Sequence, residues 1–184
     1  MITEKTKLRK MLLQQRNQIS QQDFAEQNMK ILGYLKDYLR RSTPERVLSF
    51  YPHGAEPDLR SLFNLDGYFF ALPRVLAPGS MEFAHMDENT PIVRGAYGIY
   101  EPDLCSPAIE VLDEMVALVP CIGMDSNGYR IGYGGGYYDR FLAKYDITAI
   151  GILFSDFLLS YPFAHEKHDR KLAGYCTDQG LVLL

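Results

Sequence analysis

Short apolar runs alternate with helix-forming segments along this chain, and the alternation limits its possible folds more than any other feature. The runs of strand length are residues 47–51, 68–72, 81–86, 115–119 and 147–154. Helices are predicted over residues 4–18, from the Ser20 N-cap to Pro44, over 57–63, and around 141–145. Strands that alternate with helices are typical of an α/β sandwich with a largely parallel sheet, which is the predicted fold.

Size and charge exclude several classes of protein. With 184 residues, of which 47% are apolar and 23% charged, the chain is predicted to form a single domain over residues 1–184. A net charge of −4 provides no basic field, so we predict no nucleic-acid partner. The chain has no signal-peptide pattern and no membrane-spanning apolar run, so we predict a cytoplasmic protein without a membrane partner. Cys105, Cys121 and Cys176 share no metal-ligand spacing and are expected to be free thiols.

The segment 130–140 carries the strongest chemical signal in the chain. Four of the five residues from 132 to 136 are glycines, and a predicted helix follows them. Backbone N–H groups that lead into a helix start form a cradle for anions such as phosphate, and Arg130 adds a positive charge. Asp139, in the first helical turn, is a candidate magnesium ligand. The segment matches neither a P-loop nor a dinucleotide fingerprint, so a plain surface turn remains the alternative.

Two cations and one acid elsewhere are further candidates. Lys5 and Arg9 are four residues apart and project from the same face of the first predicted helix, where they could bind phosphate or simply face solvent. Asp169 follows His168 in a loop and is either a second magnesium ligand or a turn cap. His165 and His168 lack a third ligand for a zinc site.

A possible pocket for a polar heterocycle lies just past the first predicted strand. Ligands of α/β sheets gather at the carboxyl ends of strands, and Glu56 and Tyr51 lie there. Glu56 could accept hydrogen bonds from ring N–H groups while Tyr51 offers a stacking surface. A solvated glutamate is the alternative reading.

Taken in order, these residues resemble the 5-formyltetrahydrofolate cyclo-ligase family, also called methenyltetrahydrofolate synthetases. The resemblance spans essentially the whole chain. The elements that carry it are Lys5-x-x-x-Arg9, Tyr51 with Glu56, Gly128-Tyr129-Arg130-Ile131-Gly132-Tyr133-Gly134-Gly135-Gly136-Tyr137-Tyr138-Asp139-Arg140, and His168-Asp169.

The resemblance implies a three-layer α/β sandwich similar to the sugar-phosphate isomerase and CoA-transferase group. It also implies magnesium- and ATP-dependent cyclisation of 5-formyltetrahydrofolate to 5,10-methenyltetrahydrofolate, with ADP and phosphate released after the formyl oxygen is phosphorylated. The implied metal ligands are Asp139 and Asp169. The implied catalytic residues are Arg130, Tyr133 and Tyr138. The implied folate contacts are Tyr51, Glu56, Tyr133 and Tyr137. The implied ATP contacts are Lys5, Arg9, Arg130, Ile131, Gly132, Tyr133, Gly134, Gly135, Gly136, Tyr137 and Tyr138.

The partners are expected to be small molecules, and the protein is expected to be a monomer. The chain departs from the family pattern at Met124, where an aromatic residue is common, at Glu114-Met115, and at Ala173-Gly174, where a second aspartate is usual. Two other functions remain open. A folate- or nucleotide-binding module without activity would share the glycine cradle, and so would a different ATP-dependent phosphotransferase.

Overall fold

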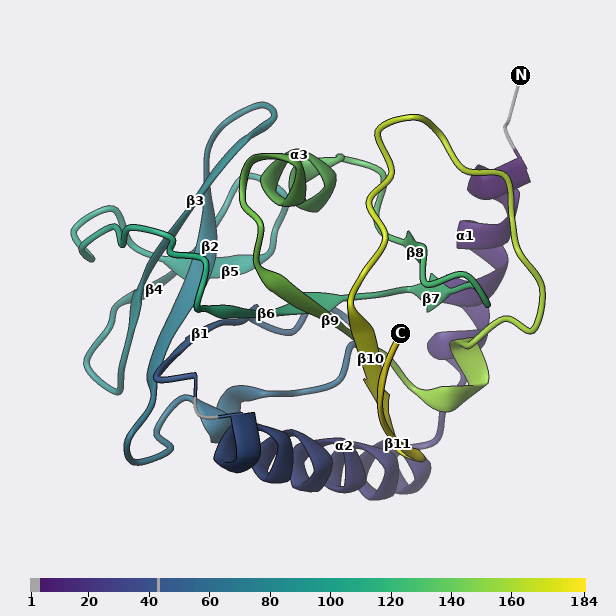
Figure 1. The fold of residues 1–184 in the computed structure, drawn as a ribbon, viewed down its shortest axis with the longest axis horizontal. Helices are drawn as coiled ribbons and strands as arrows, with labels where there is room; N and C mark the ends of the chain where they lie inside the picture. The colour runs from purple at the N-terminus through teal and green to yellow at the C-terminus, as the bar shows by residue number, and fades with distance from the viewer. Residues whose placement is uncertain (1–3, 43) are drawn as a thin grey trace.

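A seven-stranded sheet forms the centre of the molecule in a computed structural model that describes residues 4–42 and 44–184 (Figure 1). Its strands lie in the order β11-β10-β9-β6-β1-β2-β3. Their bounds are β1 Arg46–Leu48, β2 Phe69–Ala77, β3 Ser80–Met86, β6 Val116–Pro120, β9 Thr148–Ile152, β10 Gly174–Thr177 and β11 Gly180–Leu183. Two small hairpins accompany the sheet: β4 Ile92–Arg94 with β5 Tyr100–Pro102, and β7 Gly123–Met124 with β8 Arg130–Ile131.

The sheet is parallel in its middle and antiparallel at both edges. Strands β10, β9, β6, β1 and β2 run parallel, whereas β11 and β3 return as hairpin partners of β10 and β2. The inner strand β6 is buried along most of its length, as expected of a parallel strand that is covered on both faces. Because the parallel strands end at the same edge, residues that follow β1 and β6 come together there.

Helices cover the sheet on both faces, which confirms the predicted three-layer α/β sandwich. Helix α2 (Gln21–Ser42) lies on one face and buries an apolar stripe of Ile31, Leu35 and Leu39 against the sheet (Figure 1). Helix α3 (Tyr137–Lys144) lies on the opposite face, and α1 (Glu4–Arg16) lies beside the β7–β8 hairpin. The Ser20 hydroxyl accepts a 3.1 Å hydrogen bond from the Asp23 N–H group, as predicted for a helix start.

Several predicted elements differ from the structure. The helix expected over 57–63 is a single 3₁₀ turn at Arg60–Leu62, and the strand expected over 47–51 ends at Leu48. Strand β2 continues through Pro73 to Ala77. Strands β10 and β11 and both small hairpins were not predicted. Cys121 and Cys176 are buried free thiols as expected, whereas Cys105 is exposed.

One hydrophobic cluster fills both sides of the sheet. It joins side chains of α2, such as Leu35, to strand residues such as Leu118 and Ile150 and to Phe141 of α3. Among helices built from the described residues, none has both the length and the apolar character needed to cross a bilayer.

Candidate active site

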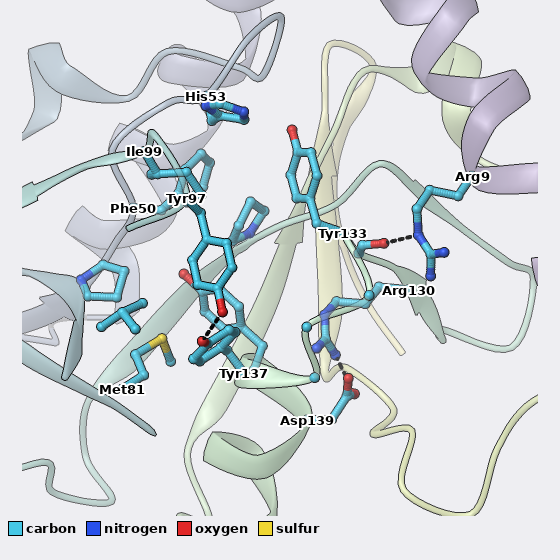
Figure 2. Close-up of a pocket in the computed structure, with 18 of the residues that line it drawn as sticks. Arg9, Phe50, His53, Met81, Tyr97, Ile99, Arg130, Tyr133, Tyr137 and Asp139 are labelled. Atoms are coloured by element: carbon cyan, nitrogen blue, oxygen red, sulfur yellow. Dashed lines mark hydrogen bonds and ion pairs between the residues drawn. The ribbon is translucent and has the colours of Figure 1, made fainter. Parts of the chain in front are cut away.

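A cavity of about 600 Å³ opens at the carboxyl ends of the parallel strands (Figure 2). Residues that follow β1 form one wall, the glycine loop and the start of α3 form the floor, and α1 contributes Lys5 and Arg9. The loop 166–169 completes the rim at the end nearest Lys5. Ligand pockets of α/β proteins have this location, because loops from several strands converge there.

The glycine loop connects β8 to α3 and lines the cavity with its backbone. Gly134 has φ +96° and Gly136, at the N-cap of α3, has φ +67°, conformations that L-residues with side chains adopt rarely. No side chain of the described residues caps this helix start, so its N–H groups remain available to an anion. The Arg9 Nε atom donates a 2.6 Å hydrogen bond to the Gly132 carbonyl oxygen, which fixes a cation directly against the loop.

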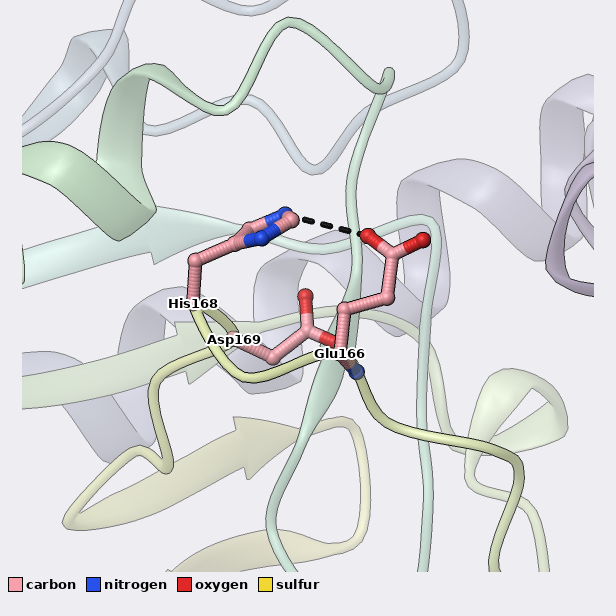
Figure 3. A group of neighbouring side chains, drawn as sticks. All are labelled: Glu166, His168 and Asp169. Atoms are coloured by element: carbon pink, nitrogen blue, oxygen red, sulfur yellow. Dashed lines mark hydrogen bonds and ion pairs between the residues drawn. The ribbon is translucent and has the colours of Figure 1, made fainter.

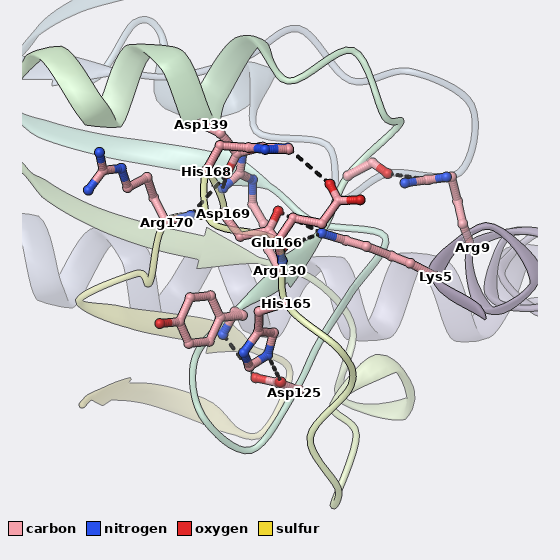
Figure 4. Close-up of polar contacts among 12 residues, drawn as sticks. Lys5, Arg9, Asp125, Arg130, Asp139, His165, Glu166, His168, Asp169 and Arg170 are labelled. Atoms are coloured by element: carbon pink, nitrogen blue, oxygen red, sulfur yellow. Dashed lines mark hydrogen bonds and ion pairs between the residues drawn. The ribbon is translucent and has the colours of Figure 1, made fainter. Parts of the chain in front are cut away.

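Two ion pairs lie beside this loop (Figure 4). Arg130 is almost fully buried, and its Nη1 atom lies 3.0 Å from Asp139 Oδ1. The Lys5 ammonium group donates to both carboxylate oxygens of Asp169, at 2.6 and 2.7 Å. Lys5, Arg130, Asp139 and Asp169 all line the same cavity, although Lys5 and Asp169 are 164 residues apart in the sequence.

The candidate metal ligands are arranged differently from the predicted pair. Ligand atoms of Glu166, His168 and Asp169 lie within 4.8 Å of one another, and Asp139 is not part of this group (Figure 3). Asp169 Oδ2 also accepts a 2.8 Å hydrogen bond from the Glu166 N–H group, so it serves as the turn cap considered above. Asp139 and Asp169 thus share the cavity, each already paired with a cation, and their joint role as metal ligands stays a prediction.

A buried carboxylate holds the loop that carries Asp169. The Asp125 side chain is fully buried, accepts hydrogen bonds from the Asn127 and Tyr129 N–H groups, and lies 2.6 Å from His165 Nε2. The His165 ring stacks on Tyr129 with centroids 3.8 Å apart. These contacts join the β7–β8 turn to residues 163–165 and thereby fix the position of the rim.

At the other end of the cavity, Glu56 is buried with one oxygen unpaired. Its Oε2 atom accepts a 2.9 Å hydrogen bond from the His53 N–H group, whereas Oε1 has no partner among the described residues. Burial raises the pKa of Glu56, and the positive charge of Arg16 partly offsets that rise. A buried polar atom without a partner is costly, so an unpaired oxygen that lines a cavity indicates a ligand donor.

Tyr51, Tyr133 and Tyr138 line the same cavity as this carboxylate. Tyr51 lines the cavity, and its ring lies 5.4 Å from that of Tyr100. Burial, followed by the negative charge of Glu56, raises the pKa of Tyr133 to about 12. The buried Tyr138 hydroxyl has no partner among the described residues, and burial raises its pKa as well. Tyr133 and Tyr138 therefore stay protonated near neutral pH and can donate hydrogen bonds.

The cavity brings together every predicted site residue except Ile131. The Ile131 side chain is fully buried in the core, and its carbonyl oxygen accepts a hydrogen bond from the Ile122 N–H group. Ile131 belongs to a hairpin strand, so the prediction that it lines the ATP site is not supported by its position.

Sequence reasoning missed several residues that line the cavity. They are Phe50, His53, Met81, Tyr97, Ile99, Tyr100, Glu101 and Glu166. The Tyr137 hydroxyl donates a 2.9 Å hydrogen bond to the Tyr97 hydroxyl, which connects α3 to the β4–β5 hairpin. That connection has no signature in the sequence. His53 and Glu166, in contrast, directly neighbour the predicted segments.

The positions that depart from the family pattern lie away from the cavity. Met124 is fully buried in β7, near Gly151 of β9. Ala173 directly precedes β10; its N–H group donates to the Ala149 carbonyl oxygen, and its carbonyl oxygen accepts from the Leu184 N–H group. Neither position lines the cavity.

Solved structures share this fold over nearly its whole length. A methenyltetrahydrofolate synthetase from Aquifex aeolicus superposes with a TM-score of 0.85 and 24% identity, covering 98% of this chain and 93% of the other. One from Mycoplasma pneumoniae gives 0.78 and 22%, covering 96% and 99%. The fold is therefore that of the α/β class to which these synthetases belong.

Sequence comparison supports a narrower assignment. The model of the 5-formyltetrahydrofolate cyclo-ligase family matches residues 1–178, and the chain belongs to this family. A relative named 5-formyltetrahydrofolate cyclo-ligase in Mycolicibacterium smegmatis is 28% identical over 98% of this chain and 97% of its own length. Another relative of that name, from Mycoplasma pneumoniae, is 26% identical over 77% and 78%. The name designates a ligase, so the family is one of enzymes.

Proposed function

We propose that this chain cyclises 5-formyltetrahydrofolate to 5,10-methenyltetrahydrofolate and converts ATP to ADP and phosphate in a magnesium-dependent reaction. One observation carries the proposal. A single cavity contains a backbone anion cradle with three cations at one end and a buried carboxylate among tyrosines at the other. Such a cavity suits two substrates that meet in its middle, one with phosphates and one with a polar aromatic ring.

The reaction consists of two displacements. The formyl oxygen attacks the γ-phosphorus of ATP, and the bond from that phosphorus to the bridging oxygen breaks, which releases ADP. The folate nitrogen at position ten then attacks the activated formyl carbon, the carbon–oxygen bond breaks, and phosphate leaves. The proton of that nitrogen is lost to solvent. Because phosphate replaces a hydroxide-like leaving group, no protein nucleophile is required, and catalysis depends on positioning and charge neutralisation.

The phosphate end of the cavity supplies both positioning and charge neutralisation. Lys5, Arg9 and Arg130 bring positive charge to the glycine loop, and the free N–H groups at the start of α3 can bind a phosphate oxygen. In the structure these cations are paired with Asp169, the Gly132 carbonyl oxygen and Asp139, respectively. ATP binding would exchange some of these pairs for contacts to phosphate.

Magnesium fits the carboxylates at the rim. Asp169 and Glu166 provide oxygen atoms, the ligands that Mg²⁺ prefers, and Asp139 lines the same cavity. Bound there, the ion would neutralise negative charge on the ATP phosphates. His168 is a poorer magnesium ligand, and its 3.0 Å contact with Glu166 orients that side chain.

The folate end is formed by Glu56 and the tyrosines. The unpaired Glu56 oxygen can accept hydrogen bonds from N–H groups of the reduced pterin ring. Tyr51 and Tyr133 provide ring faces on which the pterin can stack.

The test follows the near-ultraviolet absorbance of the methenyl product. Purified protein should generate this absorbance only when 5-formyltetrahydrofolate, ATP and magnesium are all present, and one ADP should form for each product molecule. Omission of ATP, or addition of a chelator, should abolish the signal. No methenyl product with all components present refutes the proposal.

Two further outcomes would identify the alternatives. Folate binding without ADP release would indicate a binding module that lacks activity. ADP release with phosphate transferred to a different acceptor would indicate another phosphotransferase.

A further inference from the structure

Arg16 is a buried arginine that forms no close ion pair with any described residue. It lies in the last turn of α1 and is only 2% exposed, and no carboxylate of the described residues lies within 4.0 Å of its nitrogen atoms. Buried arginines are uncommon unless they are paired, because removing the charge from water is unfavourable. Some other interaction must therefore account for its position.

The guanidinium group of Arg16 lies outside the cavity and contacts a residue that lines its folate end. Its Nη2 atom donates a 2.7 Å hydrogen bond to the Tyr133 hydroxyl oxygen, and its Nη1 atom lies 3.5 Å from the Cys121 carbonyl oxygen. The Arg16 Nε atom is buried without a hydrogen-bond partner in the part of the chain that the structure describes. Arg16 itself does not line the cavity, so any effect on a ligand passes through the residues it contacts.

The Tyr133 hydroxyl and the Glu56 carboxyl group both respond to the positive charge of Arg16. Tyr133 is 44% exposed and belongs to the glycine loop, yet its hydroxyl oxygen is fixed by the bond from Arg16. Since that oxygen accepts from Arg16, its own proton is directed away from Arg16, and its interaction with Glu56 lowers the pKa of that carboxyl group. The charge of Arg16 also lowers the pKa of Glu56, which favours the carboxylate form that accepts hydrogen bonds.

We propose that Arg16 is a positioning residue for the folate end, which fixes the Tyr133 hydroxyl in place in the cavity. Arg9 and Arg16 are seven residues, or two turns, apart on α1 and therefore share a face. One helix thus serves both substrates: its first two turns present Lys5 and Arg9 to the glycine loop, and its last turn supports the folate pocket. This inference rests on the proposed function.

The test separates the two substrates in steady-state kinetics. Arg16→Met should raise the KM for 5-formyltetrahydrofolate at least about tenfold, the effect of losing one hydrogen bond to a charged group, and change the KM for ATP less than about threefold. Lys10→Met removes a charge from the exposed face of the same helix and should leave both constants unchanged. Arg16→Lys keeps the charge and should recover part of the loss.

A double-mutant cycle with Tyr133→Phe tests the contact itself. Because both single changes remove the same hydrogen bond, the double variant should bind folate about as weakly as Arg16→Met alone. Additive effects, or equal increases in the KM values for folate and ATP, would overturn the inference. If Arg16→Met does not fold, the same cycle with Arg16→Lys decides by the same criterion.

Folate binding, measured apart from turnover, separates the role of Arg16 from the activity of the enzyme. Calorimetric titration of 5-formyltetrahydrofolate without ATP measures the folate site in the absence of turnover. An active wild-type enzyme with normal folate binding in Arg16→Met refutes only the role of Arg16. A wild-type protein that neither binds nor converts the folate overturns both.

Discussion

Gly136 should tolerate alanine poorly, whereas Gly132, four residues earlier in the same loop, should tolerate it well. Gly136 has φ +67° and ψ 13°, the left-handed helical conformation. A side chain in that conformation costs about 1–2 kcal/mol, because the Cβ atom crowds the backbone. Gly132 is not among the glycines with positive φ, and a Cβ atom there would have no neighbour within 4 Å.

Comparing Gly136→Ala with Gly132→Ala isolates the part of the change in unfolding free energy that arises in the folded state. Replacing glycine by alanine also removes about 0.4–1 kcal/mol of conformational freedom from the unfolded chain, and this contribution is similar in both variants. The difference between the two unfolding free energies is therefore about 1–2 kcal/mol. The new Cβ atom at Gly136 would also lie 2.7 Å from Arg140 Nη1, whose side chain donates to the Gly135 and Gly79 carbonyl oxygens. Displacement of that side chain would enlarge the difference.

Urea denaturation and thermal unfolding measure this difference directly. For a protein of this size, about 1–2 kcal/mol corresponds to a Tm that is about 2–8 °C lower in Gly136→Ala than in Gly132→Ala. Equal stability of the two variants would refute the left-handed conformation of Gly136. Reversal of the order would refute the geometry of the whole loop.

Three further variants test the site. Arg9→Met should raise the KM for ATP about tenfold or more with little effect on the KM for folate, because it removes a cation from the glycine loop; equal effects on both constants would argue against that role. Asp139→Asn should abolish turnover while circular dichroism stays unchanged, since an amide binds magnesium poorly; near-normal turnover would remove Asp139 from the metal site. Burial raises the pKa of Glu56 above its unfolded value, so its contribution to stability is fully present below the unfolded pKa and is lost as pH rises through the folded pKa. Glu56→Gln should therefore raise the Tm at neutral pH, with the gain vanishing in acid, while folate binding weakens; a lower Tm at neutral pH would contradict the unpaired oxygen.

Strands with strong local signals could be predicted from the sequence, and those that depend on a neighbour could not. The runs that became β6 and β9 are continuous and apolar, as buried parallel strands are. Strand β10 begins with Gly174 and has only four residues, and its strand structure follows from pairing with β9. Edge strand β11 then depends on β10.

The helix expected over 57–63 forms only as a short turn, because a tertiary contact overrides the local preference for helix. Pro57 suits a helix start, and apolar residues follow at helical spacing. In the structure, the Asn28 side chain of α2 binds both backbone groups of Asp58: its Oδ1 atom accepts from the N–H group at 2.7 Å, and its Nδ2 atom donates to the carbonyl oxygen at 3.1 Å. This contact holds the backbone of Asp58 outside a helix and leaves only the turn at Arg60–Leu62 as helix. Single-sequence periodicity cannot anticipate an amide on another helix.

The same limit explains why the phosphate end of the site was easier to predict than the folate end. Glycines near a helix start and cations at helical spacing act through the backbone geometry of their own segment, so Gly136, Arg9 and Arg130 carry a local signal. The folate end depends on which side chains three distant segments bring to one place. Arg16 illustrates this, because a charged residue near a helix end usually indicates solvent exposure. Its burial follows only from Tyr133, which arrives from the glycine loop more than a hundred residues later.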